Sequence, residues 1–368
     1  MFHSKKGLKI ILAVVMMLVV VFALSCSPSA PATPDQPDKP EPEKVYTMRY
    51  SHGLPAQHYI AGVQAAFVEK AIQLSDGQLE IEVYPSAQLY NDRDIVEALA
   101  TGAVEAGGLY SYVLAPVIPI FEIYNVPGCA DSKEQVLGIL GGGPIKDKLV
   151  AACEAKGLKP IFIQPWGSGG EMAGYAGTGK QIIDLKDQKG KKIRAISAPH
   201  VAVVEAGGGH GVFMSGAELY TAMQRGTLDT LSVASAHLIE RKLVEVSEWF
   251  TSNIPVGADM MSVITVNKAF YDSLPADLQK VLMDAGEAVY QENKLIGWDV
   301  NSKYKDMLIE MPDFEVVTLT DEQREEWLVE VFPIIKGYLS GLGPDVVEIF
   351  NMCQAHNTKL GLPSSPIE

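Results

Sequence analysis

The sequence predicts an α/β protein built of two discontinuous lobes, and three observations support this. The composition is globular, with 47% hydrophobic residues, and the stretch from about residue 45 to residue 368 is long enough for two domains of ordinary size. The pattern over 46–108 runs strand, helix, strand, helix, strand, which favours an open parallel sheet. A second strand-helix-strand unit follows at 190–231, and we expect it to form the core of the second lobe.

The first unit is defined by clear periodicities. Residues 46–52 and 79–84 alternate as strands, while 59–74 carry apolar side chains at helical spacing until Gly77 stops the helix. A helix over 93–101 precedes the third strand. Ligands of open α/β sheets bind beyond the carboxyl ends of the strands. The polar residues expected at or just after those ends are His52, Asn91 and Tyr110.

Each of these three residues also has an ordinary structural interpretation. His52 fits a hydrogen-bonded turn residue, and Asn91 is a natural turn former. Tyr110 has an apolar body that fits a core position equally well. We therefore carry them as candidate ligand contacts beside those alternatives.

The second unit places an arginine inside a predicted strand. A Lys/Gly cluster leads into an apolar run over 190–196 that contains Arg194. A helix over 218–225, closed by Gly226, and a return to strand at 228–231 follow. An arginine at such a position needs an anion. The alternatives are a surface arginine or one half of a structural ion pair.

The rest of the chain predicts further helices and buried strands. The elements expected are a helix over 134–156 broken at 141–144, a strand over 158–164, a helix over 237–249 and a strand over 260–267. From 276 to about 307 the helical pattern runs without a proline, which would give a single helix of about 48 Å.

A glycine-rich run over 165–175 follows the strand at 158–164. Its glycine density suggests backbone that passes close to a ligand, or a hinge where the chain crosses to a second domain. Trp166 and Glu171 are the candidate ligand contacts in this run. A carboxylate at 171 would repel an acidic ligand unless an amine, a hydroxyl or a cation lies between them.

The N-terminal residues predict export and anchoring. Lys5, Lys6 and Lys9 precede an apolar stretch of about fifteen residues, which is short for a membrane span. The stretch ends before Cys26 in a sequence that resembles a lipobox, so 1–26 is expected to be a lipoprotein signal peptide with Cys26 lipidated. An ordinary signal peptide or a retained anchor helix are the alternatives. Residues 27–44 are rich in proline and predict an extended linker.

Charge and cysteine content exclude some classes of protein. The formal net charge of −15 offers no basic stripe for phosphates, so nucleic-acid binding is not expected. Apart from Cys26, the cysteines are Cys129, Cys153 and Cys353, without CxxC spacing. Three buried thiols are the favoured interpretation. One disulfide is the alternative, and the sequence does not select its pair.

The sequence lacks the common catalytic signatures. The segment 167–169 lacks the G-x-S-x-G elbow of serine hydrolases, and no H-E-x-x-H, P-loop or G-x-G-x-x-G motif occurs. The seven histidines are scattered along the chain. We therefore expect a protein that is not an enzyme and uses no cofactor, with an exported hydrolase as the alternative.

Several motifs together resemble the solute-binding proteins of TRAP transporters, the tripartite ATP-independent periplasmic family, including its C4-dicarboxylate-binding members. The family's D-L-K-G-x-K-x-R segment is similar to 184–194, which carries a short insertion. Its E-x-Y-x-A-L-x-x-G-x-x-D segment is similar to 218–229. Its Y-P-x-x-Q-L-G motif is similar to 84–90, where Tyr90 replaces the glycine.

The resemblance implies a fold like that of periplasmic binding proteins, with a hinge and a long helix spanning both lobes. The first lobe would comprise about 45–170 and 257–297, and the second about 171–256 and 298–368. It implies that the guanidinium of Arg194 binds a ligand carboxylate, since a planar fork matches a carboxylate where lysine offers only a point charge. It also implies a receptor outside the cytoplasm that delivers a small organic acid to the small and large membrane subunits of a TRAP permease.

Departures from the family pattern narrow the range of ligands that we expect to bind. Val233 and Gly216 stand where the sialic-acid-binding branch has asparagine and phenylalanine, so that sugar acid is not expected to bind. A pocket lined by Met214, Gly216, Ser232 and Val233 suits a less hydroxylated acid. Asp229 is not followed by the Glu-Trp pair of the sodium-assisted keto-acid binders, so no metal is expected. A binding protein for another importer or for a sensor is the alternative function.

Overall fold

The computed structural model describes residues 44–92, 94–255, 259–362 and 364–368. The predicted signal peptide, Cys26, almost all of the proline-rich segment and the return crossing near Gly257 lie outside the described residues. Lys44–Glu368 forms one unit, in which two sheets carry the fold. Within the described ranges, no helix is long and apolar enough to cross a membrane.

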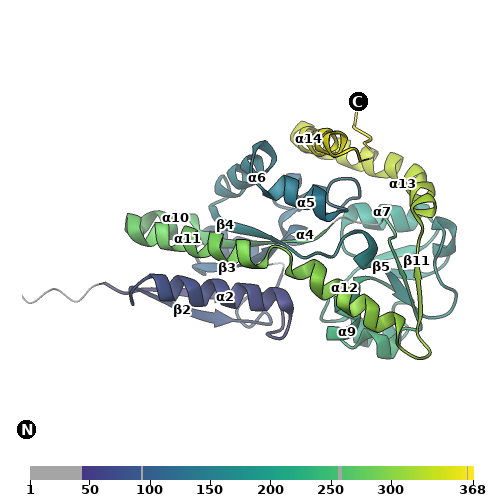
Figure 1. The fold of residues 1–368 in the computed structure, drawn as a ribbon, viewed down its shortest axis with the longest axis horizontal. Coiled ribbons are helices and arrows are strands. Elements are labelled where there is room, and N and C mark those ends of the chain that lie inside the picture. The colour runs from purple at the N-terminus through teal and green to yellow at the C-terminus, as the bar shows by residue number, and fades with distance from the viewer. Residues whose placement is uncertain (1–43, 93, 256–258, 363) are drawn as a thin grey trace, which may run out of the picture. The chain divides into compact units, whose positions relative to one another are not determined.

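The first sheet has the strand order β2-β1-β3-β10-β4; Figure 1 labels β2, β3 and β4. Its strands are β1 (Tyr46–Ser51), β2 (Leu79–Tyr84), β3 (Ala106–Tyr110), β4 (Leu158–Pro165) and β10 (Met261–Asn267). Strand β1 pairs in parallel with β2 and β3, which confirms the open parallel sheet expected from 46–108. The later strand β10 enters between β3 and β4 and is antiparallel to both.

Helices cover this sheet. They are α2 (Tyr59–Leu74), α3 (Ile95–Thr101), α4 (Ser111–Leu114), α5 (Lys133–Leu140), α6 (Pro144–Glu154), α10 (Lys268–Ser273) and α11 (Ala276–Asn293), with a 3₁₀ helix, η1, at Pro119–Tyr124. Helix α2 has the predicted bounds, and its buried residues include Ile60, Val63 and Phe67 at helical spacing. The predicted break between α5 and α6 is also confirmed, because Gly142 and Gly143 have φ values of 119° and 96°.

The second sheet has the strand order β11-β9-β5-β8-β6-β7. Its strands are β5 (Ala173–Gly177), β6 (Lys192–Ala195), β7 (His210–Phe213), β8 (Thr230–Ala234), β9 (Trp249–Ser252) and β11 (Glu315–Thr318). Strand β6 is parallel to β7 and β8, as the unit at 190–231 predicts. A 3₁₀ helix, η2 (Gly170–Met172), precedes β5. The helical segments that follow, up to β9, are η3 (Leu185–Gln188), α7 (Ala198–Ala206), α8 (Leu219–Gln224), α9 (Ser235–Glu240) and η4 (Leu243–Val246).

The prediction of one helix over 237–249 was wrong. Helix α9 ends at Glu240, and Lys242 has φ 55°, a left-handed conformation that no α-helix continues through. The chain then forms η4 and β9, and β9 pairs with β5 and β11. Pairing within the sheet thus overrides the helical periodicity of this short amphipathic stretch.

The prediction of one unbroken helix from 276 to 307 was also wrong. Helix α11 ends at Asn293, and a separate helix, α12 (Ile296–Ile309), begins three residues later. The interruption, at 294–295, lies next to Gly297 in the first turn of α12, which packs against the chain after β4: a Cβ atom at Gly297 would be 2.1 Å from the carbonyl oxygen of Trp166. Helix α11 packs on α2 and β4, whereas α12 packs on α9, α2 and β11 (Figure 1). The two helices in sequence therefore still connect both sheets.

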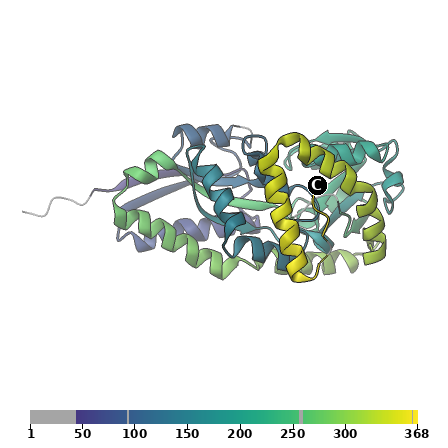
Figure 2. The same cartoon turned by 90° about the horizontal axis from the view of Figure 1, so that it is seen from above.

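The C-terminal helices are α13 (Asp321–Leu342) and α14 (Pro344–Leu360). Helix α13 packs on α7 of the second sheet, but α14 packs on α5, α6 and η1 of the first, beside the blue helices in Figure 2. The structure here differs from the expected assignment of all of 298–368 to the second lobe. The amides of Gln354 and Asn357 each donate a 2.7 Å hydrogen bond to the carbonyl oxygen of Gly128 and help to fix α14 there.

The cysteines of the described chain are unbridged. Cys129, Cys153 and Cys353 are all buried free thiols, which confirms the favoured interpretation of the sequence. Burial raises the pKa of Cys129 and of Cys153, so both thiols are protonated at neutral pH.

Candidate functional site

A cavity of about 730 Å³ lies between loops of the first sheet and loops of the second. The first sheet contributes residues that follow β1, β3 and β4, among them Leu54, Tyr112 and Trp166. The second contributes residues that follow β6 and β7, and part of β8. Most of these segments continue from the carboxyl ends of parallel strands, where open α/β sheets bind ligands. The volume is within the range of small-molecule sites.

Arg194 is the central cation of the cavity. It alternates in β6 with Ile193 and Ala195, which are fully buried, so its own side chain points to the other face of the sheet. Its Nε donates to the carbonyl oxygen of Met214 at 3.2 Å and its Nη1 donates to that of Ser232 at 2.6 Å. These two bonds fix the orientation of the guanidinium.

Arg194 keeps its charge but has no acidic partner among the described residues. Burial lowers its pKa to about 10, so it is still protonated at neutral pH. Over the ranges that the structure describes, no carboxylate lies within ion-pair distance of this side chain. The structure thus does not support the alternative of a structural ion pair, because Arg194 is held by neutral carbonyl groups.

Most of the sequence-predicted contacts are brought together around Arg194. Those that line the cavity are Trp166, Asn91, Tyr110, Met214, Gly216 and Ser232, together with Val233. Met214 and Ser232 act on Arg194 through their backbone carbonyls. Asn91 also serves as a turn former, since its Oδ1 accepts a 3.2 Å hydrogen bond from the backbone N–H of Asp94. Direct ligand contact by each of these residues stays a prediction.

Two predicted contacts are not brought to the cavity. His52 is buried at 3% exposure, and its ring lies edge-on to that of Tyr50. Glu171 points elsewhere: its side chain is 61% exposed, and its Oε2 lies 3.2 Å from Nζ of Lys305 on α12. Glu171 is therefore paired within the protein and is not among the residues that line the cavity. The lysine satisfies the carboxylate that the sequence left without a partner.

Sequence reasoning missed several polar residues of the cavity wall. Tyr112 donates a 2.6 Å hydrogen bond from its hydroxyl to Oδ2 of Asp92, and both residues line the cavity. Arg241 and His237 also line it. Arg241 and His237 fall within the helix wrongly predicted over 237–249, so sequence reasoning did not place them in the cavity wall. Their spacing of four residues on one helical face was the available signal.

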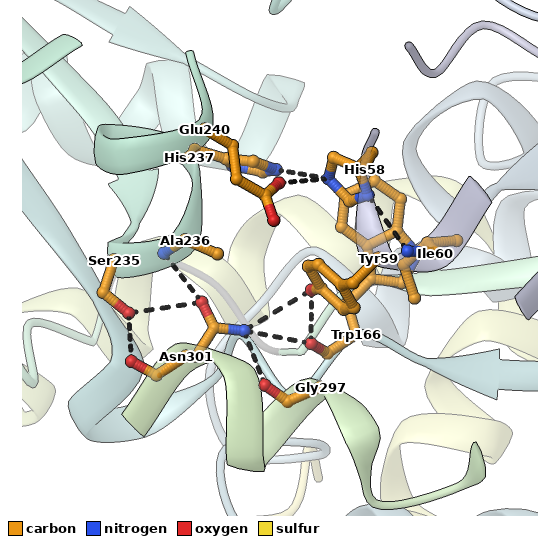
Figure 3. Close-up of polar contacts among 10 residues, drawn as sticks. All are labelled: His58, Tyr59, Ile60, Trp166, Ser235, Ala236, His237, Glu240, Gly297 and Asn301. Carbon is orange, nitrogen blue, oxygen red and sulfur yellow. Dashed lines mark hydrogen bonds and ion pairs between the residues drawn. The ribbon is translucent and has the colours of Figure 1, made fainter. Parts of the chain in front are cut away.

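Beside the cavity, Asn301 links the two sheets (Figure 3). The side chain is fully buried and projects from α12. Its Oδ1 accepts a 3.0 Å hydrogen bond from the backbone N–H of Ala236 on α9, and its Nδ2 donates to the carbonyl oxygen of Trp166 at 3.2 Å. The hydroxyl of Tyr59 donates to the same carbonyl at 2.6 Å. One amide side chain thus joins segments that follow β4 and β8.

A histidine pair forms a second link above Asn301 in Figure 3. Nε2 of His58, at the start of α2, lies 3.3 Å from Nε2 of His237 on α9 and 3.8 Å from Oε2 of Glu240. Nδ1 of His58 accepts from the backbone N–H of Ile60, so the proton of the neutral ring is on Nε2. Nε2 of His237 is then the acceptor. Burial lowers the pKa of His58 to about 3 and lowers that of His237 well below its usual value, so both rings are neutral.

Comparison with known proteins identifies the family. Residues 50–340 match the family DctP, described as bacterial extracellular solute-binding protein, family 7. The chain belongs to this family. That confirms the resemblance to TRAP solute-binding proteins and places the chain among extracellular receptors.

Relatives of family 7 cover most of the chain. The C4-dicarboxylate-binding periplasmic protein DctP of Rhodobacter capsulatus is 27% identical over 288 residues, which is 77% of this chain and 83% of that protein. Its namesake in Vibrio cholerae is 25% identical over 303 residues, 82% and 89% of the two chains. Both are solute-binding proteins.

Solved structures of family members share the fold. A TRAP periplasmic solute-binding protein of Sulfurospirillum deleyianum with bound succinate superimposes with a TM-score of 0.74 at 20% identity, covering 85% of this chain and 99% of that one. One from Sulfitobacter with bound β-D-galacturonate gives 0.75 at 18% identity, covering 83% and 98%. These likenesses confirm the two-lobed α/β fold.

Metal ligation finds no support in the family 7 domain as described. Among the residues placed in the structure, no group of three or more His, Cys, Asp or Glu side chains could hold a metal ion. Asp229, whose neighbours differ from those of the sodium-assisted relatives, accepts from the backbone N–H of Lys192 at 2.8 Å and lies near its Nζ. Asp229 is therefore paired with Lys192 within the protein.

The carboxyl of Glu240 is expected to make stability depend on pH. Burial raises its pKa from 4.5 to about 7, although the positive charge of Arg241 opposes this. Because the folded-state pKa is the higher one, its stabilising effect is complete below about pH 4.5 and is lost as the pH rises through about 7. Glu240→Gln removes the ionisable group. We expect the free energy of unfolding of this variant, relative to wild type, to rise between about pH 5.5 and about pH 8.

Chemical denaturation of both proteins at the two pH values measures this difference. In Glu240→Gln, the side-chain amide would also occupy the position of Oε2 of Glu240. This buried carboxylate oxygen has no hydrogen-bond partner among the described residues. An identical difference at both pH values would show that Glu240 does not titrate between them.

Proposed function

We propose that this protein is the extracytoplasmic receptor of a TRAP transporter and binds a small organic acid through Arg194. The observation that carries the proposal is a largely buried guanidinium that two backbone carbonyls orient and that no carboxylate in the described part of the chain neutralises. A buried cation without a partner is unfavourable, so the site is built for an anion that arrives from outside. Membership of family 7 and the ligands bound in structures of its relatives, succinate among them, support an acid.

The walls of the cavity favour an acid with few hydroxyl groups. Val233, Met214, Ile196 and Met260 contribute apolar surface, and Trp166 contributes a large aromatic ring. A hydroxyl that meets an apolar wall loses its hydrogen bonds with water and gains none in return. We therefore propose a carboxylic acid with an apolar body, in contrast to the sugar acids in several relatives' structures.

Delivery of that acid would involve the two membrane subunits of a TRAP permease. The family and the fold support this role, because the relatives are solute-binding proteins and the matched domain here spans nearly the whole described chain. The same evidence favours a receptor without turnover over an exported hydrolase.

A thermal-shift screen of organic acids on the domain from residue 44 onward tests the proposal. A ligand that binds the folded state alone raises its stability in proportion to the logarithm of its concentration over Kd. We expect at least one carboxylic acid of low hydroxyl content to raise the melting temperature progressively with concentration. If no acid does so, the proposal of an organic-acid receptor is wrong.

We also propose that Cys26 carries a lipid and that residues 27–44 tether the domain to the membrane. The support comes from the apolar stretch that ends in a lipobox-like sequence and from the prolines that follow it. Cys26→Ala is expected to move the protein from the membrane fraction to the soluble fraction of cells. Unchanged retention in the membrane fraction would contradict the lipid anchor.

A further inference from the structure

A second arginine lies in the cavity wall. Helix α9 ends at Glu240, and Arg241 follows as the residue that caps it, with its backbone N–H donating to the carbonyl oxygen of His237 at 3.1 Å. Its side chain lines the same cavity as Arg194. The left-handed Lys242 turns the chain away directly afterwards. The end of α9 thus presents one long cationic side chain to the ligand space.

Gly216 makes room for this side chain. A Cβ atom at Gly216 would lie 3.0 Å from Cζ of Arg241, 3.1 Å from its Nη2 and 3.2 Å from its Nη1. Gly216 is not among the glycines of positive φ, so its backbone does not require glycine. Space for the guanidinium is therefore the physical reason for glycine here. From the sequence, Gly216 is interpreted as the loss of a ligand-contacting phenylalanine. In the structure, the guanidinium of Arg241 lies beside it.

The guanidinium of Arg241 has no partner within the protein as described. It forms no hydrogen bond or ion pair with any residue placed in the structure, although it is largely buried. The adjacent acid, Glu240, lies beside His58. Of the acids that line the cavity, Asp92 accepts from the hydroxyl of Tyr112, and Glu218 is exposed and forms no ion pair with Arg241. Burial also lowers the pKa of Arg241, which reflects the loss of water around the charge. Such a cation gains most from an anionic group of a ligand.

We infer that Arg241 binds a second acidic group of the ligand, so that the receptor selects diacids over monoacids of the same carbon skeleton. The inference rests on the proposed function, because it takes Arg194 as the contact for the first carboxylate. The two guanidinium groups sit on different supports, one on the carbonyls of Met214 and Ser232 and the other over Gly216. Each also repels the other: the charge of Arg241 contributes to the lowered pKa of Arg194. A ligand with two negative groups neutralises both cations, and a monoacid leaves one unpaired.

Titration calorimetry with matched acids tests the inference. The pairs are succinate with butyrate, glutarate with pentanoate, and adipate with hexanoate, measured on wild type and on Arg241→Met. Methionine keeps an unbranched apolar side chain and removes the charge. For the diacid that fits best, we expect wild type to bind it at least about 30-fold more tightly than its monoacid. In Arg241→Met that preference should fall to within about threefold, through loss of diacid affinity alone.

Two further variants control the experiment. Gly216→Ala forces the guanidinium of Arg241 to shift, so it should weaken diacids several-fold more than it weakens their monoacids. Arg225→Met removes an exposed arginine at the end of α8, outside the cavity, and should change neither affinity. The Gly216 variant keeps the test decisive if Arg241→Met does not fold.

The possible outcomes separate the inference from the function it rests on. If Arg241→Met weakens a diacid and its monoacid by the same factor, both arginines bind one carboxylate and the inference is wrong. If the variant weakens neither acid, Arg241 makes no ligand contact and the inference is also wrong. If no acid of either kind binds wild type, the organic-acid receptor itself is contradicted, and with it the second contact.

Discussion

Arg194→Lys is expected to weaken binding of the cognate acid by at least about thirtyfold. Breaking a buried, charge-assisted pair costs about 2–5 kcal/mol, because the remaining charge is left without its partner, and each 1.4 kcal/mol is about tenfold in affinity. Lysine retains the charge, but it offers a single ammonium where arginine offers a planar fork. In this site the guanidinium of Arg194 donates to two carbonyl oxygens, and it must also donate to the carboxylate of the ligand.

Calorimetric titration with the best acid from the thermal-shift screen measures the loss. Arg225→Lys is the matched control, because it makes the same chemical change at an exposed position outside the cavity. Melting of the ligand-free variants shows whether both are folded. Binding by Arg194→Lys as tight as by wild type would overturn the assignment of Arg194 as the carboxylate contact.

The architecture was predictable where periodicity and chain breaks agree. Helix α2 has an apolar stripe at helical spacing and a glycine just after its end, so its bounds follow from the sequence. Arg194 could be placed in a strand because apolar residues flank it on both sides. Motif resemblance then supplied its role. These patterns are local, and a local pattern predicts the folded structure correctly when tertiary contacts do not override it.

The errors arose where distant segments decide the local structure. The stretch 237–249 has helical periodicity, but β9 forms because β5 and β11 provide pairing partners on both sides. The long helix is interrupted where Gly297 meets Trp166, a contact between residues far apart in the chain. Neither cause is visible in a sequence window. The division of the chain into lobes beyond 298 depends on the same kind of contact, since α14 packs back on α5 and α6.

The candidate site shows the same limit. Sequence reasoning found Arg194 but not Arg241, because the latter faces the cavity only through the turn that ends α9. It named Glu171 as a candidate contact in the glycine-rich run, whereas Lys305, more than a hundred residues later, binds that carboxylate. Charge pairing between distant residues decides which ionisable groups remain available for a ligand. Only the three-dimensional structure shows that pairing.

Asn301→Ala is expected to lower the free energy of unfolding by about 2–4 kcal/mol. Leaving a buried donor or acceptor unsatisfied costs about 1–3 kcal/mol. Asn301 is fully buried and serves several such groups: it accepts from the N–H of Ala236, and it donates to the carbonyl oxygens of Trp166 and Gly297. Alanine satisfies none of them and leaves a cavity as well. The lost stability would come from the contact that Asn301 makes between the segments that follow β4 and β8.

Two companion variants locate the effect in denaturant unfolding. Asn301→Asp keeps the shape and the acceptor for Ala236, but in its ionised form it cannot donate to Trp166, and it places a charge in a buried site. It should therefore also destabilise the fold. Asn293→Ala, at the end of α11, removes a single 2.9 Å hydrogen bond to Val289 in its own helix and should cost less than about 1 kcal/mol. If Asn301→Ala unfolds at the same denaturant concentration as Asn293→Ala, the amide of Asn301 does not hold the two sheets together. A midpoint for Asn301→Ala well below that of the control, with an unchanged slope, would establish the link as a stability effect.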